Sequence, residues 1–367
     1  MNSPLHLWHP FTNAVIDPKP LRVVQAEGVY LHTADGRKIM DAISSWWVNL
    51  HGHANPRIAA AIAGQARKLE HVILAGFTHD AAEELAERLS KWVPHDLRHL
   101  FFSDDGSTAL EVALKLAVQH FGNLGRPEKC EIVALEHGYH GDTVGAMSVS
   151  DESPFTEPFR LMRYPVHRVH SAYCYRCPVG LKRESCHIEC AQQLEILLAD
   201  RGAQIAAVIV EPLLQGAGGM IVHPAEFLQR VRTLCAAHDV LLLADGAMLR
   251  SGGIRENQAH TFYHGHSYTG NALACAAANE NLRIFDDEPV FDRISTIARI
   301  HGERLDQLRE MRQVGDIRQI GAVGALELRT EDAGYLSAMR PKLYQFFLER
   351  GVLLRPWAMS STLCLRM

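Results

Sequence analysis

Residues 206–212 read Ala-Ala-Val-Ile-Val-Glu-Pro, an unbroken apolar run that ends in a carboxylate and a proline. A run without alternating polar residues is typical of a strand that is buried on both faces of a parallel sheet. Val240 to Ala244 repeats the pattern and is followed by Asp245, and Glu131 to Leu135 forms a third short strand. These runs predict a sheet that helices cover on both faces.

The segments around these strands complete an alternating pattern. Thr108 to Gln119 is predicted to be a helix, because its apolar residues recur at helical spacing on one face. Leu97 to Ser103 is predicted to be a further strand, and Phe291 to Met311 a long amphipathic helix that opens a smaller C-terminal domain. The fold class is therefore α/β, with a mostly parallel sheet.

Length and composition bound the class of protein. The chain has 367 residues, which suits one large domain and a smaller one. We expect the large domain over residues 46–280 and the smaller α/β domain over residues 1–45 with 281–367. The formal net charge is −5, and no basic stripe indicates nucleic-acid binding. No apolar run approaches the roughly 18 residues that a membrane helix needs, and no signal-peptide layout opens the chain. We expect a cytoplasmic protein.

Polar residues stand where strands end and helices begin. Gly106 and Ser107 open the predicted helix, where free N–H groups suit a phosphate. An ordinary helix cap is the alternative interpretation. Glu211 and Asp245 each end an apolar strand, where a carboxylate needs a partner and could hold a protonated pyridine nitrogen. A turn or cap role is the alternative for both.

Two glycine-containing segments add to this set. Residues 136–143, Glu-His-Gly-Tyr-His-Gly-Asp-Thr, follow a strand at the edge where open α/β sheets bind ligands. Tyr139 in this segment can stack on a planar cofactor. Residues 264–271, His-Gly-His-Ser-Tyr-Thr-Gly-Asn, precede an alanine-rich helix and offer a second phosphate contact. A polar turn is the alternative for each segment.

The remaining candidates are aromatic residues and cysteines. Residues 44–47, Ser-Ser-Trp-Trp, place two tryptophans side by side, and one of them could wall a pocket for an apolar substrate chain, with core packing as the alternative. Four cysteines form the pattern C-x2-C-x8-C-x3-C and could hold zinc, at positions Cys174, Cys177, Cys186 and Cys190. The middle spacer is short for a zinc ribbon, so we favour a loop of reduced cysteines and assign no metal.

The order of these motifs resembles that of the class III, fold-type I aminotransferases, which use pyridoxal 5'-phosphate. The resemblance runs from about residue 5 to about residue 357. The motifs that carry it are Trp8-His9-Pro10-Phe11-Thr12, Ser44-Ser45-Trp46-Trp47, Asp105-Gly106-Ser107-Thr108, Gly138 to Thr143, Glu211-Pro212, Leu243-Ala244-Asp245 and His264 to Asn271. The first two motifs narrow the resemblance to the adenosylmethionine-8-amino-7-oxononanoate aminotransferases of biotin biosynthesis.

The resemblance implies a reaction, an assembly and a set of site residues. The reaction is transfer of an amino group from S-adenosylmethionine to 8-amino-7-oxononanoate, giving 7,8-diaminononanoate. The assembly is a homodimer with its active sites at the interface. The implied contacts are Gly106, Ser107 and the partner subunit's Ser267 for the cofactor phosphate, Tyr139, Asp142, Glu211 and Asp245 for the cofactor ring, and Trp46 and Arg355 for the substrate. Tyr139 and Asp245 would take part in catalysis.

The sequence departs from this family at the cofactor lysine, whose amine forms a Schiff base with pyridoxal phosphate. The family carries that lysine between the Asp245 motif and the His264 motif, on a longer segment than this chain has. Here Gly246 to Tyr263 contain no lysine. Residues 358–367 also depart from the family pattern, in the manner of a frameshifted tail. We expect an internal deletion, an altered C-terminus and an inactive chain.

Two other functions remain open. One is a class III aminotransferase that acts on another ω-amino acid, against which the Ser-Ser-Trp-Trp motif argues. The other is a protein of the same fold that binds the cofactor or a partner without turnover, which the missing lysine favours. A decayed gene copy and an error in the gene sequence are further explanations of the missing segment.

Overall fold

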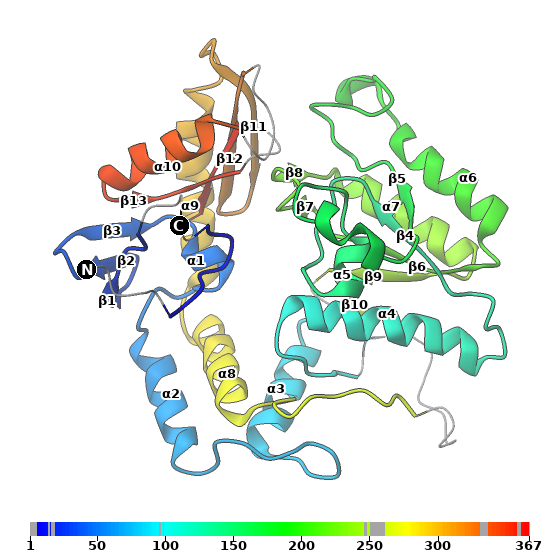
Figure 1. Ribbon diagram of the computed structural model, residues 1–367, viewed down its shortest axis with the longest axis horizontal. Helices are drawn as coiled ribbons and strands as arrows, with labels where there is room; N and C mark the ends of the chain where they lie inside the picture. The colour runs from blue at the N-terminus through cyan, green and yellow to red at the C-terminus, as the bar shows by residue number, and fades with distance from the viewer. Residues whose placement is uncertain are drawn as a thin grey trace.

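The computed structural model describes residues 6–13, 15, 19–94, 97, 99–245, 248–249, 261–330, 337–357 and 361–366. Within these residues the chain forms one five-stranded sheet, two four-stranded sheets and a two-stranded ribbon. Figure 1 shows the five-stranded sheet and its helices as one body, with the two smaller sheets together in a second. The predicted combination of a large α/β part with a smaller one is confirmed.

The five-stranded sheet holds the strands that the apolar runs predict. Its order is β10-β9-β6-β4-β5, and β4, β5, β6 and β9 run parallel while β10 is antiparallel to β9. The bounds are β4 Glu131–Leu135, β5 His167–Val169, β6 Ile205–Val210, β9 Leu241–Ala244 and β10 Met248–Leu249. Every residue of β6 is buried, as its unbroken apolar sequence predicts.

Helices cover both faces of this sheet. On one face α4 (Gly106–Asn123) and α5 (Val144–Val149) pack Leu110, Ala117 and Ala146 against β4 and β6. On the other face lie α6 (Gln192–Arg201) and α7 (Ala225–Ala237), whose apolar residues pack against the opposite side of the same strands. Burial on both faces fixes the strands in place, so their carboxyl ends form a rigid edge.

One predicted strand is wrong. The described residues between 97 and 103 have no regular secondary structure. The apolar residues there resemble a strand, but a strand needs a neighbour to accept and donate its backbone hydrogen bonds. The described five-stranded sheet offers this segment no ladder partner. The long helix predicted from Phe291 is present as α9 (Val290–Asp306), which ends five residues earlier than predicted.

The second body joins the two ends of the chain. The N-terminal strands β1 (Val23–Glu27), β2 (Tyr30–Thr33) and β3 (Lys38–Asp41) form an antiparallel sheet, and β13 (Val352–Leu353) pairs parallel with β3. A second sheet has the order β11-β12-β15-β14, with bounds β11 Val314–Ile320, β12 Val323–Leu328, β14 Arg355–Trp357 and β15 Ser361–Arg366. Residues from the two ends of the sequence therefore pair in this body.

Three further helices pack together, and the other elements are short or lie on one body. Helix α8 (Ala272–Asp287) packs against α2 (Pro56–Ala66) and α3 (Asp80–Ser90) and runs through residue 280, the predicted domain boundary. The other elements are α1 (Ser44–Trp47), α10 (Met339–Glu349), β7 (Leu214–Gln215), β8 (Ile221–Val222) and the 3-10 turns η1 Glu157–Met162, η2 Arg183–Ser185 and η3 Glu189–Ala191. The exact division into domains stays a prediction.

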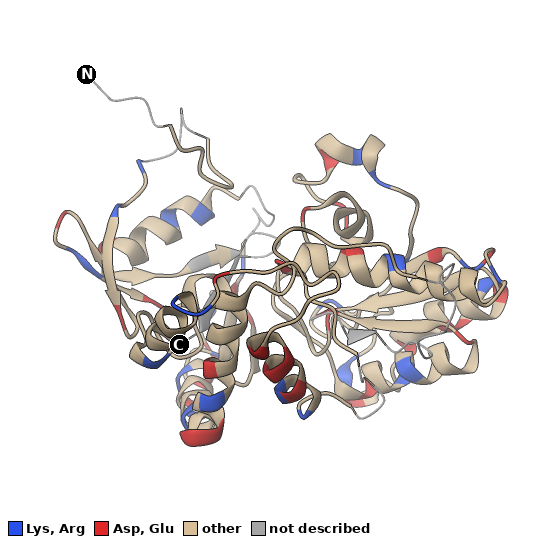
Figure 2. Cartoon of the chain, turned by 90° about the horizontal axis from the view of Figure 1, so that it is seen from below, with Lys and Arg blue, Asp and Glu red and all other residues tan. Residues whose placement is uncertain are grey.

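Charged residues of both signs are interspersed over the face seen in Figure 2. The many ion pairs of the described surface, such as Arg57 with Glu280 at 2.7 Å and Arg230 with Glu195 at 2.8 Å, follow from this mixing. Within the described residues, the longest and most apolar helices still fall short of what a membrane crossing requires.

Candidate functional site

The candidate site lies at the carboxyl edge of the five-stranded sheet. β4, β6 and β9 are parallel neighbours, so their carboxyl ends meet at one edge. Glu136, Glu211 and Asp245 are the residues that directly follow these strands. Residues far apart in the sequence, 136–143, 211–216 and 245, are therefore brought to one place, as the sequence predicts.

Asp245 is held there by a histidine that sequence reasoning did not select. His140 Nδ1 lies 3.0 Å from an Asp245 carboxylate oxygen, and the His140 side chain is 1% exposed. The backbone N–H of His140 donates to Ser150 Oγ at 2.8 Å, which fixes the position of the residue. A buried imidazole in contact with a carboxylate sets the orientation of that carboxylate. His140 is therefore a positioning residue for Asp245.

Glu211 joins two loops of the site. Its carboxylate oxygens accept the backbone N–H groups of Tyr139 and Gly216, each at 2.9 Å. The residue as a whole is half-buried, yet burial of its carboxyl group raises the pKa to about 8, and the nearby charge of Asp245 adds to the rise. The two N–H donors act in the opposite direction. The Glu211 side chain thus fixes the backbone of both loops, and its burial raises its carboxyl pKa.

The start of α4 is open and close to the glycine-containing loop. Asp105 caps the helix by accepting the Thr108 N–H at 2.9 Å, in a reciprocal capping box. A Cβ added at Gly106 would meet no atom within 4 Å, so the helix start faces free space. Ser107 Oγ accepts the backbone N–H of Asp142 at 3.3 Å. This is the environment that a phosphate requires at a helix N-terminus.

Gly141 explains why a glycine is required in the loop. Its φ is +124°, and an added Cβ would lie 2.0 Å from Ser107 Oγ. Any larger residue would push the loop away from α4, so the close approach depends on the missing side chain. Glu111 of α4 strengthens the same junction, because its carboxylate accepts the Gly145 N–H at 2.6 Å.

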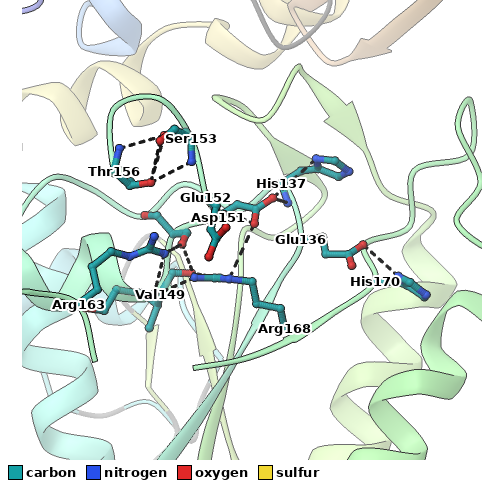
Figure 3. Close-up of polar contacts among 12 residues, drawn as sticks. Glu136, His137, Val149, Asp151, Glu152, Ser153, Thr156, Arg163, Arg168 and His170 are labelled. Carbon is teal, nitrogen blue, oxygen red and sulfur yellow. Dashed lines mark hydrogen bonds and ion pairs between the residues drawn. The ribbon is translucent and has the colours of Figure 1, made fainter. Parts of the chain in front are cut away.

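Figure 3 shows the polar contacts that hold the loop after β4 in place. The His137 N–H donates to Asp151 Oδ2 at 2.7 Å, and His137 has a φ of +62°. Arg163 and Arg168 both donate to the carbonyl oxygen of Ser150 at 2.7 Å. Two guanidinium groups on one carbonyl, together with the Asp151 contact, fix both ends of the loop. The loop that carries Tyr139 is therefore held firmly, while Tyr139 itself is 41% exposed.

The tryptophan pair lies on an unusual turn. Ser44, Ser45, Trp46 and Trp47 have φ values of 49°, 47°, 63° and 76°, which form a left-handed turn. Ser45 Oγ donates to Asp41 Oδ2 at 2.7 Å and supports it. The Trp46 ring is exposed and lies 5.6 Å from the Phe11 ring.

Trp47 contacts a different part of the molecule from Trp46. A Cβ added at Gly216 would lie 3.6 Å from the Trp47 ring and 3.9 Å from a Glu211 carboxylate oxygen. Trp47 therefore reaches the Glu211 part of the site. Sequence reasoning chose only Trp46, because it cannot tell which of two neighbouring rings a left-handed turn directs inward.

Two predicted site residues are not brought to this edge by contacts. Ser267 is exposed on the turn before α8, where the neighbouring His266 Nε2 lies 3.6 Å from Asp104 Oδ1. Its predicted role belongs to the partner subunit's site and stays a prediction. The backbone of Arg355 belongs to β14, and its side chain lies outside the described residues.

The four clustered cysteines line one small cavity on the segment that follows β5. Cys174, Cys177, Cys186 and Cys190 are all free thiols. Burial raises the pKa of Cys190 to about 11. In the described part of the chain, no three His, Cys, Asp or Glu side chains are arranged to hold a metal ion.

Comparisons with known proteins place this chain in a family. A family model described as aminotransferase class-III matches residues 12–253 and 246–366. The adenosylmethionine-8-amino-7-oxononanoate aminotransferase of Synechococcus elongatus is 39% identical over 400 aligned positions, covering 97% of this chain and 92% of the relative. That of Geobacter sulfurreducens is 36% identical, covering 88% of this chain and 82% of the relative.

Solved structures share the fold. The crystal structure of the enzyme of the same name from Methanocaldococcus jannaschii is 28% identical, with a TM-score of 0.89 and coverage of 98% of this chain and 92% of the other. An amine transaminase from an uncultivated Pseudomonas species, solved in a pyridoxal-phosphate-bound form, is 27% identical with a TM-score of 0.89, over 100% of this chain and 94% of the other.

The alignments also bear on the expected deletion. The 400 positions aligned with the Synechococcus relative exceed the 367 residues of this chain, so the relative has residues that this chain lacks. The two stretches of the family match meet at residues 246–253, the segment in which the sequence departs from the family pattern. The second stretch extends through residue 366 and so includes most of the unusual tail.

Proposed function

Because this chain belongs to the class III aminotransferases, we propose that it binds pyridoxal 5'-phosphate and descends from the enzyme that aminates 8-amino-7-oxononanoate. The donor would be S-adenosylmethionine and the product 7,8-diaminononanoate, a step of biotin biosynthesis. The names of the relatives support this substrate pair, and their alignments cover nearly the whole chain. A cytoplasmic homodimer is part of the same proposal.

The observation that carries the proposal is the linked set of polar groups at the sheet edge. The half-buried Asp245 contacts the buried His140, and Glu211 links the Tyr139 loop to Gly216. An oriented carboxylate beside an exposed aromatic ring fits a protonated pyridine ring that stacks on Tyr139. The open start of α4 at Gly106 fits the phosphate of the same molecule.

When bound, pyridoxal phosphate would supply an electron sink and would carry the amino group from donor to acceptor. In this proposal Gly106 and Ser107 bind its phosphate, with the partner subunit's Ser267. Asp245 holds a proton on the ring nitrogen, while Asp142 lies beside Ser107. The Trp46 ring shields an apolar substrate chain, and Arg355 binds a substrate carboxylate.

The fit fails at one point, because transamination also needs a lysine amine to move protons at the substrate carbon. Gly246 to Tyr263 contain no lysine. We therefore propose that this chain keeps the cofactor-binding part of the family's machinery and turns over slowly or not at all. The same feature favours a cofactor-binding protein without turnover as the second candidate function.

The proposal is tested with the purified full-length chain. Equilibrium dialysis against pyridoxal phosphate measures retained cofactor, and product formation from S-adenosylmethionine and 8-amino-7-oxononanoate measures turnover. We expect about one bound cofactor per chain and a weaker affinity for the cofactor in Asp245→Asn. We expect the rate of product formation not to exceed that of free pyridoxal phosphate without protein. Fast turnover with other ω-amino acids but not with S-adenosylmethionine would refute the proposed donor. Failure to bind cofactor would refute the proposed function.

A further inference from the structure

The chain has eight lysines, and all of them lie within the described residues: Lys19, Lys38, Lys68, Lys91, Lys115, Lys129, Lys182 and Lys342. None of them falls in the segments that follow β4, β6 and β9, at residues 136–143, 211–216 and 245. Lys38 belongs to β3, Lys182 to the cysteine loop and Lys342 to α10. Lys91 pairs with Glu87 at the end of α3.

Two lysines, Lys115 and Lys129, lie on or beside the elements of the five-stranded sheet, and both are engaged elsewhere. Lys129 is fully buried, and its amine donates to the carbonyl oxygens of Gly202 and Asp239 at 2.9 and 2.8 Å. Lys115 lies nine residues after Gly106 on α4, about 13 Å along the helix axis from the phosphate end. Its amine is 2.9 Å from His264 Nδ1. Neither amine faces Asp245 or Tyr139.

We infer that this chain holds the vitamin B6 coenzyme through its phosphate and ring alone, with no covalent bond, and that it binds the aldehyde and amine forms about equally. The inference rests on the proposed function, since it concerns the same site. The groups available to the coenzyme are Gly106, Ser107, Tyr139 and Asp245, and these meet parts of the molecule that the two forms share.

The argument is one of differential binding. A lysine that condenses with the aldehyde stabilises only the aldehyde form, since the amine form has no carbonyl to react. Without that lysine, preference between the forms rests on groups that approach the exocyclic carbon. Among the described residues, Asp245 is held by His140 and would meet the ring nitrogen, while Glu211 binds the loop backbone. A ligand pair that makes the same contacts has the same affinity.

The test measures both forms on the same protein. Pyridoxal phosphate and pyridoxamine phosphate are each titrated into the apo full-length chain by calorimetry. We expect dissociation constants within about threefold of each other, which is under ~1 kcal/mol. Asp245→Asn should weaken both forms by the same factor, because it acts on the shared ring. Lys129→Met serves as a matched control and should change neither constant.

Covalent attachment is tested separately. The chain loaded with pyridoxal phosphate is reduced with borohydride and digested, and the peptides are weighed by mass spectrometry. We expect no lysine adduct whose yield depends on Asp245, since surface lysines react equally in the wild type and in Asp245→Asn. An adduct at one lysine that is lost in Asp245→Asn would overturn the inference, and so would a preference of more than about tenfold for the aldehyde form. Binding of neither form would instead refute the proposed function.

Discussion

Replacing Glu211 by glutamine should change how the stability of the protein depends on pH. The carboxyl pKa is raised from 4.5 to about 8, because burial disfavours the charged form. A group whose pKa is raised on folding adds stability that is complete below its unfolded pKa and is lost as pH rises through the folded one. The wild type should therefore lose stability between about pH 4.5 and 8. A shift of this size corresponds to a ceiling on the order of 5 kcal/mol.

Glu211 accepts the Tyr139 and Gly216 N–H groups with two different oxygens. Glutamine keeps one of these acceptors and does not titrate, so the loss of the other lowers its stability without adding a titration of its own. The assay is urea unfolding of the apo wild type and of Glu211→Gln at pH values from 5 to 9. Other groups titrate in both proteins, so the difference in unfolding free energy isolates Glu211. We expect the unfolding free energy of Glu211→Gln to increase relative to that of the wild type as pH rises, and the difference to become constant above pH 8. A difference in unfolding free energy that does not vary with pH would show that folding does not raise the pKa of Glu211, and it would refute the reasoning.

Three further substitutions test other contacts. Gly141→Ala places a Cβ 2.0 Å from Ser107 Oγ. We expect a loss of about 1–3 kcal/mol of unfolding free energy in urea and weaker binding of inorganic phosphate. Unchanged phosphate binding would contradict the close approach of the loop to α4. His140→Ala removes the partner of Asp245 and should weaken pyridoxamine phosphate binding by roughly tenfold or more, measured by calorimetry, whereas an unchanged affinity would show that Asp245 is oriented without it. Lys129→Met removes the donor from two buried carbonyl oxygens and should cost about 2–3 kcal/mol in unfolding free energy; a neutral effect would mean that water replaces the amine.

The large sheet could be predicted from the sequence because its signal is local. Residues 206–210 and 240–244 are apolar without interruption, and only burial on both faces accommodates such runs. The carboxylates that follow them, Glu211 and Asp245, reach the same edge because the strands are parallel neighbours. Pattern and topology together therefore predict the core of the site.

The strand predicted at residues 97–103 shows where local signals fail. Apolar content indicates that a segment prefers to be buried, but a strand forms only if a neighbour completes its hydrogen bonds. The role of His140 could not be predicted for a similar reason. Its partner is 105 residues away in sequence, and nothing in the loop motif distinguishes an imidazole that faces Asp245 from one that faces solvent.

The left-handed turn at residues 44–47 has a consequence for substrate recognition. Four successive residues other than glycine hold positive φ angles there, and each disfavours that conformation by about 1–2 kcal/mol. An isolated tetrapeptide of this sequence would not hold this conformation. The orientation of the Trp46 indole is thus determined by β3 and its Asp41 anchor, not by the four residues themselves. Under the proposed role of Trp46 beside the substrate chain, we expect variation in the N-terminal sheet to alter which substrates fit.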